Sequence, residues 1–272
     1  MRNALASVAA IALLALRAAA DEPEPAAAEL ARRAAAQAFG GDAVEVWKSE
    51  WNDEELVFGV ARRHDAGKLQ LFVRVLAPHK YEPLSFLLLP GSDGGPIIEY
   101  YLSPRLFGPD RPFGPDRRVG RTLELQVASA VERLPFAPGL PALAELWPPR
   151  AEGASLARLA DESSDGTPCR VLERRLREPD GPYDRVVTLL ARDSNVALES
   201  RFFLGDKLVR RVVVAAKDVD RSGERAVVRR RVVEEPGEAD QVLSLERFSP
   251  DPVFPDQLFT SQNLRTGRFP SY

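Results

Sequence analysis

The segment Thr167–Ala216 constrains the fold of this chain more than any other part of the sequence. It contains three runs rich in Val, Leu and Phe, namely Tyr183–Ala191, Val196–Leu204 and Leu208–Ala216. Gly, Pro, Asp and Asn separate these runs, and Gly205-Asp206 forms a two-residue connection that suits a type II′ hairpin. Apolar runs of this length between turn residues indicate antiparallel strands. The sequence therefore predicts a meandering sheet at the centre of the protein.

Strand patterns of the same kind occur on both sides of this segment. Lys68–Ala77 is the clearest case, because its odd-numbered positions are all apolar and its even-numbered positions, Phe72 included, form the opposite face. Further strands are expected at Ala43–Trp51, Leu56–Arg62, Leu84–Leu89, Ile97–Leu102, Val119–Val127, Ser155–Ala160, Ala226–Val233 and Gln241–Phe248. The result is a sheet of about ten strands, a size at which open sheets tend to curl.

Helical patterns are few and short. Ala26–Phe39 is rich in Ala and Arg and ends at Gly40-Gly41, which predicts an N-terminal helix with Leu30, Ala34 and Ala38 along one face. Ala128–Leu134 and Leu140–Trp147 are expected as short helices bounded by prolines. The chain would then end in a docked loop around Phe254–Thr260. We therefore expect an α+β fold that is mainly antiparallel β.

Residues 1–20 have the pattern of a secretory signal peptide. Arg2 gives a positive start, Val8–Leu16 is an unbroken apolar run, and Ala18-Ala19-Ala20 supplies small residues at the cleavage point. The apolar run is much shorter than the ~20 residues that span a bilayer. We expect cleavage before Asp21 and a single exported domain over residues 21–272, since no linker divides the remainder. The alternative is an uncleaved N-terminal anchor.

Composition argues against nucleic acid as a partner. The chain of 272 residues has 28% charged side chains and a formal net charge of −3. Nucleic-acid binding is driven by positive charge against phosphate, which an acidic chain lacks. The basic clusters Arg210-Arg211 and Arg229-Arg230-Arg231 lie in strand-like segments beside Val. They are interpreted as one solvated face of the sheet.

The sequence contains no catalytic or metal-binding pattern that supports an enzyme. Cys169 is the only cysteine, and we expect it to be a small buried side chain, with intermolecular pairing as the alternative. His64 and His79 are dispersed, whereas a zinc site needs about four ligands at suitable spacing. No Gly-x-Ser-x-Gly elbow occurs. We therefore predict no catalytic residue, no metal and no cofactor.

Several short phrases resemble the LolA-like family of periplasmic outer-membrane lipoprotein-sorting proteins. These phrases are Leu71–Pro78, Ile98–Pro104 with Arg117–Val119, Asp165–Cys169, Tyr183–Val187 and Leu258–Leu264. Their order spans most of residues 26–264 and matches a helix, a long sheet, a Pro-marked helical insertion and a resumed sheet. The repeat of Phe107–Arg111 at Phe113–Arg117 departs from the family pattern, and Pro135–Leu140 lacks the acidic, Tyr-bearing phrase of many relatives.

The resemblance implies a half-open β-barrel with a short helical lid and an apolar cavity that holds lipid acyl chains. It implies a periplasmic carrier of lipid or lipoprotein, with an inner-membrane donor and an outer-membrane acceptor as partners. We expect a monomer. The alternative is an envelope sensor or scaffold domain on the same fold, which binds a protein or lipid without transporting it.

The candidate cavity-lining residues are the aromatic side chains of the strands together with the predicted lid. They are Phe58, Phe72, Phe86, Tyr100, Leu143, Trp147 and Phe202. A barrel holds a ligand only where its inward side chains leave space. Each of these residues is therefore either a wall of the cavity or part of a filled core.

Overall fold

The structure is a computed structural model. It describes residues 25–81, 84–91, 96–101, 122–125, 134, 139–148, 154–176, 183–221, 223, 225–266 and 268–270. The predicted signal peptide, the Phe107–Arg117 repeat and the helix expected at Ala128–Leu134, apart from Leu134, lie outside these residues. No helix in the described part of the chain is long and apolar enough to cross a bilayer.

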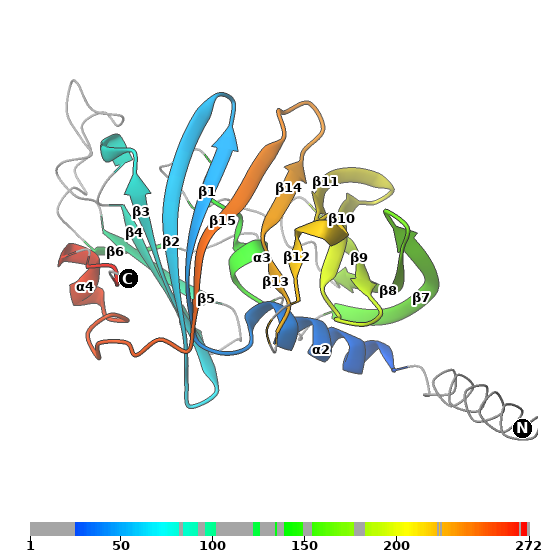
Figure 1. Cartoon of the computed structure of the whole chain (residues 1–272), viewed down its shortest axis with the longest axis horizontal. Coiled ribbons are helices and arrows are strands. Elements are labelled where there is room, and N and C mark those ends of the chain that lie inside the picture. Colours follow the sequence, from blue (N-terminus) through cyan, green and yellow to red (C-terminus); the bar gives the residue numbers. More distant parts are fainter. Residues whose placement is uncertain are drawn as a thin grey trace, which may run out of the picture.

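One antiparallel sheet of 13 strands dominates the molecule (Figure 1). Its first half contains β1 (Ala43–Trp51), β2 (Glu54–Asp65), β3 (Lys68–Ala77), β4 (Ser85–Pro90), β5 (Pro96–Tyr101) and β6 (Thr122–Leu125). Its second half contains β7 (Ala154–Ser164), β8 (Thr167–Leu176), β9 (Arg185–Ala191), β10 (Ala197–Leu204), β11 (Lys207–Val213), β14 (Arg230–Glu234) and β15 (Gln241–Pro250). The order β6-β5-β4-β3-β2-β1-β15-β14-β11-β10-β9-β8-β7 shows two meanders joined where β1 pairs with β15.

The smaller elements are attached to this sheet. They are the hairpin β12 (Val219–Asp220) and β13 (Val227–Val228), the helices α2 (Ala27–Phe39), α3 (Leu143–Leu146) and α4 (Ser261–Thr266), and the 3₁₀ turns His79–Tyr81 and Ala216–Asp218. In Figure 1, α2 runs along one end of the curved sheet, α3 lies inside the curve, and α4 lies on the outer side of the β3–β6 part. The structure is therefore α+β and mainly antiparallel β, as predicted.

The sheet is curved but open, so the expected half-open barrel is not confirmed, and its 13 strands exceed the expected number of about ten. In the described part of the chain, β6 and β7 end the strand order and do not pair with each other. Bulges interrupt the register at Val46/Trp47, Val57/Phe58, Leu159/Glu162 and Phe202/Phe203. A bulge adds a residue to one strand, so that the strand bends and its twist increases. Repeated bulges therefore curve the sheet without closing it.

Several details of the prediction are confirmed in the strands. Gly205 has a φ of 59°, and Asp206 is not among the described residues with positive φ, which is the pattern of the predicted II′ turn. The alternation of β3 is also as expected, because Leu71 and Val73 are buried on one face and Phe72 on the other. The boundaries of β1 and β3 agree with the predicted ones. The β12–β13 hairpin was not predicted, because two-residue strands carry no measurable alternation.

Apolar side chains pack on both faces of the sheet. On the concave face, a large core joins the first meander to β14, β15 and α3, and includes Phe58, Phe86, Tyr100 and Trp147. On the convex face, Phe72 packs with Phe259 and Leu264 from the chain end that contains α4. A third cluster surrounds Cys169, whose side chain is fully buried as predicted. Burial raises the pKa of the Cys169 thiol, which suits a packing role.

Candidate functional site

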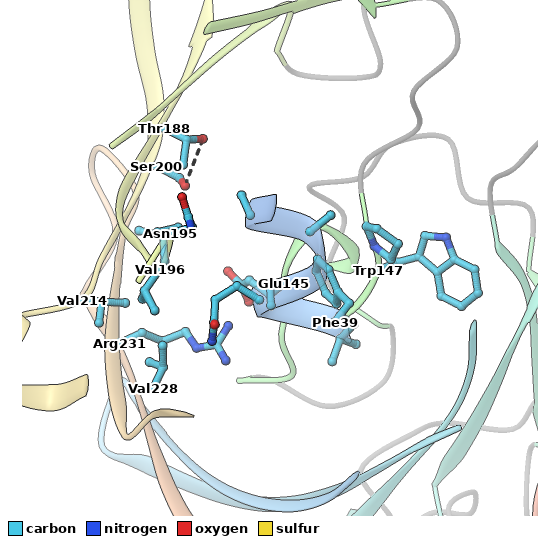
Figure 2. A pocket seen from close by; sticks show the side chains of 18 of the residues that line it. Phe39, Glu145, Trp147, Thr188, Asn195, Val196, Ser200, Val214, Val228 and Arg231 are labelled. Atoms are coloured by element: carbon cyan, nitrogen blue, oxygen red, sulfur yellow. Dashed lines mark hydrogen bonds between the residues drawn. The ribbon is translucent and has the colours of Figure 1, made fainter. Parts of the chain in front are cut away.

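A cavity of about 690 Å³ lies between the concave face of the sheet and the two helices α2 and α3 (Figure 2). Its sheet wall is built from alternate residues of neighbouring strands, which the pleat directs to one face. They include Trp47, Val60, Leu71, Leu172, Val186, Thr188, Leu190, Ser200, Phe202, Val212, Arg231 and Leu245. Most of these side chains are apolar, so the cavity is a partly open and mainly apolar space of the size typical for a ligand site.

The helix α2 forms one wall with unusually small side chains. Ala31, Ala34, Ala35 and Ala38 face the cavity and leave the space between helix and sheet unfilled. Leu30 is fully buried against Leu172 and Leu190, and therefore anchors the helix near its start. Near the helix end, Gln37 Nε2 donates a hydrogen bond of 2.6 Å to the carbonyl oxygen of Ala226. Alanine has the highest helix propensity, so the sequence keeps this wall both helical and thin.

The second wall is α3 with the residues that flank it. Leu143, Leu146 and Trp147 line the cavity and are only 5–8% exposed. The buried side chain of Gln241 secures the same segment, because its Nε2 donates to the Gly139 carbonyl at 2.6 Å and to Ser49 Oγ at 3.0 Å. This segment was expected to be a lid. The structure finds a helix of four residues packed into the core, so it forms an inner wall.

A buried charge cluster fixes α3 to the sheet. The Arg210 guanidinium on β11 donates to the carboxylates of Glu145 on α3 and of Glu235 after β14. The side chains of Arg210 and Glu145 are 4% and 6% exposed. Burial lowers the pKa of Arg210, but the charges and hydrogen bonds of Glu145 and Glu235 outweigh this effect and raise it. The charge cluster therefore keeps Arg210 ionised inside the protein and holds α3 in place.

The cavity wall also contains a small number of polar groups. Arg62 Nη2 donates to Glu45 Oε1 at 2.9 Å, and Trp47 Nε1 donates to Glu45 Oε2 at 2.8 Å. Ser200 Oγ and Thr188 Oγ1 lie 3.5 Å apart on neighbouring strands (Figure 2). Arg231 extends from β14 into the cavity, whereas Trp147 enters from the opposite side of this view. A few fixed polar groups in an apolar wall are the usual composition of a ligand site.

The structure brings together only part of the predicted site. Leu143, Trp147 and Phe202 line the cavity. Phe58, Phe86 and Tyr100 are buried in the concave-face core and do not line it. They therefore belong to the filled-core alternative.

Phe72 requires a correction, because it lies on the other side of the sheet. Its ring stacks near Phe269 at a centroid distance of 6.4 Å and packs in the convex-face cluster. Adjacent strand residues point to opposite faces, so Phe72 cannot share a face with Leu71, which does line the cavity. The alternation within Lys68–Ala77 already contains this information.

Sequence reasoning missed the small and the charged residues of the wall. Ala31, Ala35 and Ser200 give no aromatic signal, although space beside small side chains is what creates the cavity. Arg231 was assigned to a solvated face together with Arg229 and Arg230. Two adjacent strand residues cannot both face solvent on a sheet with one covered face, so Arg230 and Arg231 had to be separated.

The described residues provide no evidence for metal chemistry. No three His, Cys, Asp or Glu side chains gather there in an arrangement that could hold a metal ion. His64 Nδ1 lies 3.4 Å from Asp42 Oδ1, and this pair belongs to no group of three such side chains among the described residues. The absence of catalytic residues, metal and cofactor stays an expectation from the sequence.

Comparison with known proteins identifies the fold but gives no match by sequence. No family model matches the chain, and no curated protein is similar to it in sequence. A crystal structure of an outer-membrane lipoprotein-sorting protein domain from Vibrio parahaemolyticus superposes with a TM-score of 0.70 at 15% identity, over 87% of this chain and 97% of that one.

Two further crystal structures agree with this result. A DUF1329 family protein from Desulfovibrio piger gives a TM-score of 0.70 at 16% identity, over 86% of this chain and 96% of that one. A LolA superfamily protein from Nitrosomonas europaea gives 0.61 at 15% identity, over 88% and 99% of the two chains. The resemblance drawn from the sequence is thus confirmed at the level of the fold. This chain has the fold of the LolA-like lipoprotein-sorting proteins.

Proposed function

We propose that this protein binds the acyl chains of a lipid or lipoprotein in the cavity between α2 and the concave face of the sheet. The observation that supports the proposal is the cavity of about 690 Å³ with walls of Ala, Val, Leu, Phe and Trp side chains. Unfilled apolar space is unfavourable, and apolar cavities bind apolar guests. Each methylene group transferred from water into such a site contributes about 0.8 kcal/mol.

In its finer form, the proposal is a periplasmic carrier that moves acyl cargo towards the outer membrane. The description of the Vibrio parahaemolyticus protein as a lipoprotein-sorting domain favours this form. A carrier of this type would take its cargo from an inner-membrane donor and release it to an outer-membrane acceptor. It would act as a monomer and without catalysis. Residues 1–20 would direct export and be removed before Asp21.

The test is a titration of the delipidated protein with fluorescent acyl probes, using one variant that fills the cavity. Ala34 faces the cavity, whereas Ala28 lies on the exposed side of the same helix. Ala34→Trp places a large side chain in the empty space, and Ala28→Trp makes the same chemical change outside it. We expect the wild type and Ala28→Trp to bind saturably at micromolar concentrations and Ala34→Trp to bind at least 10-fold more weakly, as losing two methylene contacts would cause.

The outcome separates the carrier from the alternative function. Equal binding by the two tryptophan variants would place the acyl site elsewhere. Absence of saturable binding in the wild type would contradict the acyl proposal and favour a sensor or scaffold that recognises a protein. A carrier should also pass its probe to acceptor vesicles or a second protein, whereas a sensor should retain it.

A further inference from the structure

Arg231 occupies an unusual position for a charged residue. On β14 its neighbour Arg230 is exposed, whereas Arg231 pairs with the buried Leu243 of β15 and points to the concave face. Figure 2 shows its side chain extending from the sheet into the cavity. The accessible part of this side chain therefore faces the cavity and not the bulk solvent.

Two carboxylates act on Arg231 electrostatically, those of Glu145 and Glu45. Both already accept hydrogen bonds from other residues. One Glu45 oxygen accepts from Arg62 and the other from Trp47. One Glu145 oxygen accepts from Arg210 and the other accepts the backbone N–H of Ala142 at 3.1 Å. Neither carboxylate therefore pairs with Arg231, which has no ion pair among the described residues.

The contacts that Arg231 does make leave its donors unused. Its guanidinium carbon lies 4.5 Å above the centre of the Trp47 ring, in a cation–π contact. This contact uses the face of the guanidinium and leaves the N–H groups at its edge available. The buried Nε atom has no hydrogen-bond partner in the described part of the chain. Burial lowers the pKa of Arg231, and the charges of Glu145 and Glu45 only partly offset this effect.

An arginine that lacks a counter-ion away from bulk water destabilises the protein unless a ligand supplies the negative charge. An isolated buried charge is strongly unfavourable, and an arginine cannot relieve the cost by losing its proton at neutral pH. A planar fork of donors matches the two oxygens of a carboxylate or of a phosphate. Most of the remaining cavity wall is apolar, which favours an amphiphilic ligand over a small hydrophilic anion.

We propose that Arg231 binds the anionic head of an acyl ligand, a carboxylate or phosphate, while the chain lies along the apolar walls. This inference rests on the proposed acyl-binding function and adds the polarity and charge of the ligand. Trp47 holds the guanidinium flat by stacking, and the pairs Glu45–Arg62 and Glu145–Arg210 prevent the two carboxylates from neutralising it. The site therefore selects anionic amphiphiles against neutral ones of equal chain length.

The experiment compares three probes that share one alkyl chain: dodecanoate, dodecyl phosphate and dodecanol. Each is titrated against the wild type, Arg231→Met and Arg231→Lys at neutral pH, with Arg230→Met as the control for an exposed arginine of the same strand. We expect the wild type to prefer the anions over the alcohol by about 10-fold or more, as charge-assisted hydrogen bonds allow. Arg231→Met should remove this preference by weakening the binding of the two anions, and Arg231→Lys should restore part of it. The ratio of dodecanoate to dodecyl phosphate identifies the head group.

Separate measurements distinguish a folding defect of a variant from a failure of the proposal. Arg231→Met removes a half-buried charge that has no ion pair among the described residues, so its apo form should melt at or above the wild-type temperature, which a structural role would not allow. If all three probes bind and Arg231→Met keeps the anion preference, the head-group assignment is wrong and the acyl proposal stands. Loss of the preference only in Arg225→Met, at another cavity-lining arginine, would also overturn the assignment. If no probe binds the wild type, both proposals fail.

Discussion

Replacing Arg210 with methionine is expected to lower the free energy of unfolding by about 3–5 kcal/mol, the usual cost of leaving a buried charge unpaired. Methionine keeps much of the side-chain volume, so the loss comes from the charge. The Glu145 carboxylate is 6% exposed, and without Arg210 its hydrogen-bond partner among the described residues is the N–H of Ala142. Urea denaturation followed by far-UV circular dichroism measures the change. Because Glu145 belongs to α3, the inner wall of the cavity should loosen as well.

Two companion variants identify the cause. Arg230 is an exposed arginine of the same sheet, 4.0 Å from Asp218, so Arg230→Met should change stability by about 1 kcal/mol at most. Combining Arg210→Met with Glu145→Leu removes the two most buried charges of the cluster and leaves the half-buried Glu235. It should recover most of the loss, since apolar replacements of buried ion pairs are often neutral. A loss in Arg210→Met no larger than that in Arg230→Met would show that the buried cluster does not hold α3.

Replacing Phe72 with alanine is expected to destabilise the protein by about 3–5 kcal/mol, as for other buried phenylalanines, without altering ligand preference. Phe72 is fully buried, but it packs on the convex face against the chain end that contains α4. Its loss opens a void beneath Phe269, whose ring also lies on Gly59, where no side chain separates it from the backbone. Urea denaturation measures stability, and titration with acyl probes of increasing length measures preference.

Phe202→Ala is the matched variant for this prediction. Phe202 is also buried, yet it lines the cavity. Its truncation should shift the preferred chain length towards longer or bulkier probes, because it enlarges the binding space. If Phe72→Ala shifted the length preference instead, the convex-face position of Phe72 would not describe the protein in solution.

The strands and their alternation were accessible to sequence reasoning because they are local. The turn at Gly205 and the faces of Lys68–Ala77 depend on neighbouring residues, and the structure agrees with both. The extent of the sheet was underestimated, because the pairing of β1 with β15 joins segments about 200 residues apart in sequence, which no local pattern encodes. The bulges that keep the sheet open are likewise set by packing and not by composition.

The site was harder to predict than the fold, for a reason visible in two arginine doublets. Arg210-Arg211 and Arg230-Arg231 look like solvated charge in the sequence. In the structure, the pleat turns Arg211 towards Glu199 and Glu234 outside, while Arg210 and Arg231 point inward. Strand alternation requires each pair to divide between the two faces, but the sequence interpretation placed both members on one solvated face. Tertiary contacts decide which arginine of each pair points inward. Contact with α3 decides that Arg210, and not Arg231, pairs with a carboxylate.

Aromatic residues did not predict the position of the cavity, because most of them fill the core. Phe58, Phe86 and Tyr100 fill space, whereas the cavity exists where α2 supplies alanines. A large side chain more often fills part of a core than it lines an empty cavity. The small face of Ala26–Phe39 was noted in the sequence, but its meaning required knowledge of what lies opposite.

Native mass spectrometry of the full-length protein, exported with its N-terminal segment and purified without detergent, tests the central claim most directly. The acyl-binding account predicts a bound species with the mass of a lipid or lipid-modified peptide in the wild type and in Ala28→Trp, and its loss in Ala34→Trp. Tandem dissociation should release that species as an anion if Arg231 holds its head. Bare polypeptide in all three samples, under conditions that preserve non-covalent complexes, or equal amounts of the bound species in both tryptophan variants, would contradict the account.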